Sequence, residues 1–124
     1  MTQSATRKAA VVWTVAILAA CSVPGPALPQ TPGLPLSVDK WVHVGMFLGF
    51  GALWSLAAPG RAWTVLAAGL AYAVAIEVWQ GALPIGRSPD PYDAVADAVG
   101  LVAGLALAAW ARRRGNDPGG GVSG

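Results

Sequence analysis

Four apolar segments, separated by polar or proline-rich stretches, dominate the pattern of the chain. They run over about residues 9–23, 41–58, 62–83 and 92–110. A helix needs about 20 apolar residues to cross a bilayer, within a range of about 17–25. The last three segments meet this length, and the first requires tilt or local thinning of the bilayer. The pattern predicts an all-α, polytopic membrane protein: a bundle of four transmembrane helices.

The connections between these segments carry turn and loop signals. Five prolines within residues 24–35 predict a long first loop without regular structure. Pro59, Gly60 and Arg61 predict a tight turn, and residues 84–91 predict a third loop. The predicted division is an N-terminal segment over 1–8, a transmembrane domain over 9–114 and a disordered tail over 115–124.

Composition supports a membrane location. Charged residues make up 11% of the chain and hydrophobic residues 55%, whereas soluble domains average about 25% charged residues. The net charge of +2 does not indicate a nucleic-acid partner, because Arg112, Arg113 and Arg114 form one cluster beside an apolar segment. The single cysteine excludes an intramolecular disulfide framework and a cysteine-rich metal site.

The distribution of basic residues predicts an orientation. If the N-terminus is cytoplasmic, the outer side carries only Lys40 and Arg87. Six basic residues then lie on the inner side: Arg7, Lys8, Arg61, Arg112, Arg113 and Arg114. This positive-inside bias predicts that both termini are cytoplasmic.

Cys21 has two interpretations. Arg7 and Lys8, the following apolar stretch and the sequence Leu-Ala-Ala-Cys at 18–21 are typical of a bacterial lipoprotein signal with a lipidated cysteine. Alternatively, Cys21 is a small apolar residue near a helix end. We expect no lipidation, and both interpretations leave the rest of the chain in the same orientation.

Polar residues at the start of the second segment form a first set. Asp39, Lys40 and His43 lie on neighbouring parts of one helix face. Asp39 suits a helix cap, and Lys40 suits an interfacial position from which it snorkels to water. His43, the only histidine, lies about one turn deeper. It is either a hydrogen-bonded packing residue or part of a functional site.

Glu77 and Gln80 form a second set, late in the third segment. Their spacing of three places them on one face of a helix. Glu77 lies about 10 Å inside the outer end, so it must be protonated, paired or directed to a water-filled cleft. An ion pair between helices is the structural interpretation, and a functional site is the default one for an ionisable group at this depth.

A third set accompanies the fourth segment. Asp90 and Pro91 suit the cap and the first position of a helix, and Arg87 precedes them. Spacings of four, three and four place further residues on one stripe: Asp93, Asp97, Gly100 and Gly104. The two glycines predict close approach of another helix.

The predicted topology brings the three sets together in the outer leaflet. They supply seven candidate ligand-binding residues: Lys40, His43, Glu77, Gln80, Arg87, Asp93 and Asp97. We expect these side chains to line one polar cleft that opens outward. No catalytic residue can be assigned. Metal binding by His43 with Glu77, Asp93 and Asp97 is an alternative, but one histidine is a thin ligand set for a metal. We therefore expect no cofactor and no metal.

In order and spacing, these residues resemble the VanZ-like family of bacterial membrane proteins. The resemblance rests on Asp39-Lys40-x-x-His43, Glu77-x-x-Gln80, Arg87 and Asp93-x-x-x-Asp97-x-x-Gly100-x-x-x-Gly104. Asp97 stands where the family pattern has asparagine. The resemblance implies the bacterial cytoplasmic (inner) membrane, a role in the cell envelope and a link to glycopeptide antibiotic (teicoplanin) resistance, without implying a reaction.

Three functions are consistent with this pattern. The first is binding of an envelope lipid, a lipid-linked precursor or a glycopeptide at the polar cleft, with Lys40 and Arg87 contacting anionic groups. The second is a membrane enzyme that uses Glu77 or His43 as acid or base on a lipid-linked substrate. The third is a small proton-linked transporter. The expected partners are the bilayer and such a ligand, without nucleic acid, and the oligomeric state stays open.

Overall fold

The chain forms four α-helices, seen in a computed structural model that describes residues 2–23, 38–84 and 91–115. The helices are α1 (Gln3–Cys21), α2 (Val38–Ala57), α3 (Ala62–Ala82) and α4 (Pro91–Gly115), and the described residues contain no strand. In these ranges, α1, α3 and α4 are long and apolar enough to cross a membrane. The 20 residues of α2 begin with polar positions, including Lys40 and His43. The predicted all-α bundle is confirmed.

Two helices extend further than the apolar pattern predicts. Helix α1 begins at Gln3 rather than near Ala9, because the Thr2 side chain caps it by accepting a hydrogen bond from the Ala5 backbone N–H at 3.0 Å. Helix α4 continues past Trp110 to Gly115 through three arginines, which are good helix formers. The apolar pattern shows which part of a helix suits lipid, and polar residues can lengthen the helix beyond that part.

The predicted turn between α2 and α3 is confirmed. Gly60 has a positive φ of 79°, a conformation that costs glycine little, and the Arg61 backbone N–H donates to the Ala58 carbonyl at 3.2 Å. The predicted start of α4 at Pro91, with Asp93 in the first turn, is also confirmed. Several predictions lie outside the described residues: the proline-rich first loop, the third loop with Arg87, the cap at Asp90, the side chain of Asp39 and the tail beyond Gly115.

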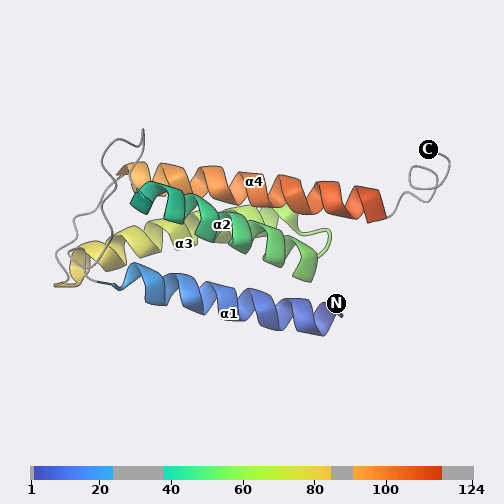
Figure 1. The fold of residues 1–124 in the computed structure, drawn as a ribbon, viewed down its shortest axis with the longest axis horizontal. Coiled ribbons are helices and arrows are strands. Elements are labelled where there is room, and N and C mark those ends of the chain that lie inside the picture. The colour runs from blue at the N-terminus through green and yellow to red at the C-terminus, as the bar shows by residue number, and fades with distance from the viewer. Residues whose placement is uncertain (1, 24–37, 85–90, 116–124) are drawn as a thin grey trace.

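Consecutive helices run in opposite directions, so α2 and α4 run parallel to each other (Figure 1). The first residues of α1 and the last residues of α4 therefore lie at the same end of the bundle (Figure 1). Helices α2 and α3 each contact the other three helices, and α2 is central because it forms the most extensive interfaces with both α1 and α4. Its interface with α4 is the most extensive in the described part of the chain, and α1 does not contact α4 there.

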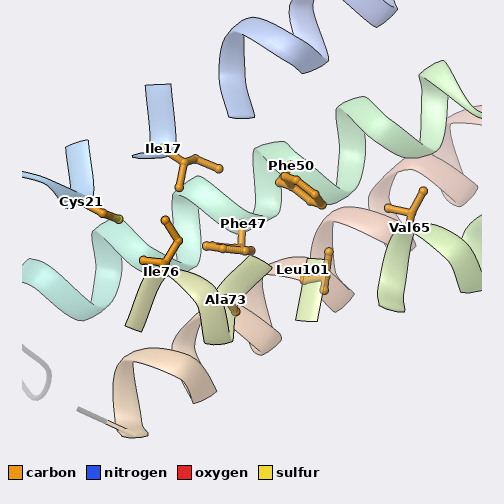
Figure 2. Close-up of a cluster of buried hydrophobic side chains, with 8 residues drawn as sticks. All are labelled: Ile17, Cys21, Phe47, Phe50, Val65, Ala73, Ile76 and Leu101. Atoms are coloured by element: carbon orange, nitrogen blue, oxygen red, sulfur yellow. The ribbon is translucent and has the colours of Figure 1, made fainter. Parts of the chain in front are cut away.

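The core contains side chains from all four helices (Figure 2). Ile17 and Cys21 of α1 meet Phe47 and Phe50 of α2, and α3 and α4 close the cluster. Cys21 is only 1% exposed, which agrees with its interpretation as a small apolar residue near a helix end. Large apolar side chains also cover the outside of every helix, a surface that suits acyl chains rather than water.

Helices α2 and α4 pack with almost no space between their backbones. A Cβ atom at Gly100 would overlap the carbonyl oxygen of Val44, and one at Gly104 would overlap that of Leu48. From the other side, a Cβ atom at Gly51 would lie 2.6 Å from the Leu101 carbonyl oxygen. The predicted close approach of a helix at the two glycines of α4 is confirmed.

Candidate functional site

The first turns of the parallel helices α2 and α4 are joined by an ion pair. The Lys40 Nζ donates to Asp93 Oδ1 at 2.6 Å, and the two side chains are 18% and 6% exposed. A lysine in the first turn of a helix opposes the helix dipole, whereas an aspartate there is favoured. Asp93 therefore stabilises its own helix and offsets the unfavourable position of Lys40.

One turn deeper, the same two helices bring together an imidazole and a carboxylate. His43 Nδ1 is hydrogen-bonded to Asp97 Oδ1 at 2.6 Å. The other ring nitrogen, Nε2, lies 3.8 Å from Asp93 Oδ2. His43 is 1% exposed and Asp97 is completely buried. The two acids of α4 thus face both nitrogens of the single histidine.

Glu77 reaches the same place from α3. Its carboxylate, the His43 ring and the Asp97 carboxylate each offer an atom within 4.8 Å of the other two. Glu77 is 9% exposed, so it points into the bundle and not to lipid. The predicted meeting of Glu77 with His43 and the acids of α4 is found in the structure. We call this set the polar cluster: Lys40, His43, Glu77, Asp93 and Asp97.

Of the two remaining candidate residues, the structure describes Gln80. Gln80 is buried, and its Nε2 donates to the Cys21 backbone carbonyl at 3.0 Å. Carbonyls at the end of a helix lack partners within that helix, so Gln80 satisfies the end of α1 and holds it against α3. Arg87 lies outside the described residues.

Four members of the polar cluster are buried, His43, Glu77, Asp93 and Asp97, whereas Lys40 is partly exposed. The expected outward-opening cleft stays a prediction. An opening lies beside the polar cluster, between the first halves of α2 and α4. There a groove of about 530 Å³ is lined by Lys40, Trp41, Val44, Tyr92, Val95, Ala96 and Val99. We call it the lateral groove. The surface of this groove is almost entirely apolar, and one of its lining residues, Lys40, also belongs to the polar cluster.

The sequence reasoning did not identify the lateral groove. A signal was present on α4, where Tyr92, Val95, Ala96 and Val99 recur at helical spacing beside the acidic stripe. Apolar residues at such spacing are expected on any lipid-facing helix, so the pattern alone does not mark a groove. A second cavity of about 390 Å³ lies among α1, α2 and α3, toward the turn at Arg61.

Comparison with known proteins gives one informative result. A family model described as VanZ/LLP1 matches residues 3–112. The match begins with the first residue of α1 and ends in the last turn of α4, so it includes the polar cluster and the lateral groove. Comparison with curated proteins and with solved structures gave no match. The resemblance drawn from the motifs is confirmed.

Proposed function

Because the chain belongs to the VanZ/LLP1 family and its helices are long and apolar enough to cross a membrane, we propose that it binds an anionic lipid or lipid-linked precursor of the cell envelope. The apolar chain of this ligand lies in the lateral groove. Its anionic head group contacts Lys40.

The observation that carries the proposal is the composition of the lateral groove. Its volume of about 530 Å³ falls within the range of about 300–1,000 Å³ typical of ligand pockets. The walls of the groove are apolar, and Lys40, whose ammonium is ion-paired with Asp93, is one of its lining residues. This arrangement suits a molecule with a long apolar part and an anionic end that shares the Lys40 ammonium with Asp93. Trp41 and Tyr92, both exposed, flank Lys40, as aromatic residues do at a membrane–water interface.

The charge distribution supports an outward-facing groove in the bacterial cytoplasmic membrane. The basic residues of the α1 start, the α2–α3 turn and the α4 end all belong to the end of the bundle where α1 begins and α4 ends. The positive-inside rule assigns that end to the cytoplasm. Lys40 and the lateral groove then lie in the outer leaflet, where envelope precursors and glycopeptides are accessible.

The enzyme alternative is less well supported. A general base must come within hydrogen-bonding reach of the reacting group. His43 is 1% exposed and does not line the lateral groove, so a ligand in the groove meets Lys40 before it meets any acid or base of the polar cluster. The geometry favours binding.

Lipid analysis of the purified protein tests the proposal. We compare the wild type with Val99→Trp, which fills the lateral groove, and with Val74→Trp, a matched change on the exposed face of α3. The wild type and Val74→Trp should retain an anionic polyprenyl or glycerol lipid in mild detergent, and Val99→Trp should lose at least about 90% of it, equivalent to about 1.4 kcal/mol. Equal retention in all three proteins would exclude the lateral groove as the binding site.

A measurement in cells distinguishes a lipid ligand from a glycopeptide ligand. If the lipid is the ligand, teicoplanin tolerance conferred by the protein should fall in parallel with lipid retention in Val99→Trp, at equal membrane expression. If purified protein instead retains added teicoplanin without any lipid, the glycopeptide is the ligand and the lipid proposal is wrong.

A further inference from the structure

We propose that His43, Glu77 and Asp97 bind one divalent cation of the first transition row, such as Zn²⁺, Mn²⁺ or Fe²⁺. The single histidine of the chain is by itself a thin ligand set for a metal. The structure brings together three possible metal-binding side chains that sequence spacing does not join. Each comes from a different helix, α2, α3 or α4, and they meet inside the bundle. This inference does not depend on the lateral groove or its ligand.

The donor geometry fits one ion. The three donor atoms lie within 4.8 Å of one another. Imidazole nitrogens and carboxylate oxygens bind Zn²⁺ at about 2.0–2.2 Å, so the donors of a tetrahedral site lie about 3.4 Å apart. Side-chain rotations that shorten the longest separation by up to about 1.4 Å bring all three atoms onto one ion.

The donor chemistry selects the class of metal. Imidazole suits zinc and iron, and carboxylates suit manganese and magnesium, so one nitrogen with carboxylate oxygens favours Zn²⁺, Mn²⁺ or Fe²⁺ over Ca²⁺ or Cu⁺. Three protein ligands also leave at least one position for water or for an oxygen of a ligand.

The surrounding contacts support His43 as a metal ligand. The nitrogen that lies against Asp97 is Nδ1, and the opposite nitrogen, Nε2, faces Asp93 at 3.8 Å. A histidine that binds a metal usually directs its other N–H to a carboxylate, which fixes the ring orientation. Lys40 in turn holds that carboxylate through the 2.6 Å ion pair.

Metal titration of the purified full-length chain tests the inference. The protein is stripped with a chelator, desalted and titrated separately with Zn²⁺ and Mn²⁺, and bound metal is counted by mass spectrometry. The wild type should hold about one ion per chain. Asp97→Asn and Glu77→Gln, which preserve side-chain size, should each bind at least about 10-fold more weakly.

Two controls make the result specific. Ser55→Ala removes another buried polar group of α2, about 18 Å from His43 along the helix, and should leave binding unchanged. Asp93→Asn removes a neighbour of the histidine rather than a ligand, and it should weaken binding by about 10-fold. Zinc X-ray absorption of the wild type, which needs no variant to fold, should show one imidazole nitrogen among oxygen donors.

The inference is overturned if the folded wild type binds neither ion, if Asp97→Asn and Glu77→Gln bind as tightly as the wild type, or if the zinc spectrum lacks an imidazole. None of these outcomes bears on lipid retention in the lateral groove, because the titration contains no lipid.

Discussion

The two sides of the central helix α2 are held to their neighbours by different means. Toward α4, backbones meet at glycines, and the polar cluster joins the first two turns. Toward α1, aromatic side chains fill the gap and donate hydrogen bonds across it: Trp13 Nε1 to the Met46 carbonyl and Trp54 Nε1 to Thr14 Oγ1, both at 2.8 Å. Helix α3 adds a similar bond, from the Tyr72 hydroxyl to the Thr14 carbonyl at 2.7 Å.

This difference indicates which contacts tolerate change. Glycine packing leaves no space for an added atom, so substitution of these glycines would force α2 and α4 apart. The α1 contacts are spread over several independent hydrogen bonds, each worth about 0.5–1.5 kcal/mol. We therefore expect the α2–α4 pair to form the rigid part of the molecule and α1 to be attached to it with more tolerance.

The largest predicted effect is at Gly100. Gly100→Leu places a side chain against the Val44 carbonyl, and overpacking a tight interface costs about 1–3 kcal/mol or more. Because the obstacle is a backbone atom, we expect the two helices to separate and the protein to lose its cooperative unfolding transition. Intrinsic tryptophan fluorescence in mixed micelles measures that transition.

Gly45 provides the control for this prediction. A Cβ atom there meets nothing within 4 Å, so Gly45→Ala should stabilise α2 by up to about 1 kcal/mol through helix propensity. Equal loss of stability in the two variants would contradict the role assigned to the glycine interface.

A smaller effect is expected at Asp97. With metal removed by a chelator, Asp97→Ala takes away the buried partner of His43 Nδ1, and an unsatisfied buried donor costs about 1–3 kcal/mol. Asp97→Asn keeps a hydrogen-bonding group and should lose less than half as much. An alanine variant as stable as the wild type would show that the His43–Asp97 contact does not hold α2 to α4.

The smallest effect is expected on the α1 side. Tyr72→Phe removes one hydroxyl and its bond to the Thr14 carbonyl while the ring still packs on Phe47 and Phe50. We expect a loss of about 1 kcal/mol in unfolding free energy, with the transition still cooperative. A loss as large as that of Asp97→Ala would contradict the greater tolerance expected where α1 is attached to the bundle.

The parts of the fold that depend on local sequence could be predicted. Apolar segment length gave the four helices, Gly60 marked the turn and Pro91 marked the start of α4. The start of α1 at Gln3 was missed because a threonine cap, and not an apolar residue, begins the helix.

The candidate site was predictable only in part, because it depends on how helices pair. The predicted topology placed His43 and Asp97 in the same leaflet, but no pattern states that α2 and α4 pack directly against each other in the register that joins these two side chains. Gln80 was expected beside the acids, whereas its hydrogen bond satisfies the end of α1. The lateral groove results from packing between two helices, and sequence periodicity does not record the space left between them.

Site-specific photocrosslinking in intact cells tests the central claim, ligand binding in the lateral groove, most directly. A photoreactive residue at Val95, in the groove, is compared with one at Val74 on the outer face of α3. We predict that Val95 captures one phosphate-bearing envelope lipid far above its abundance in the membrane, and that Lys40→Gln abolishes this enrichment. Identical lipid profiles at the two positions, unaffected by Lys40→Gln, would contradict the account.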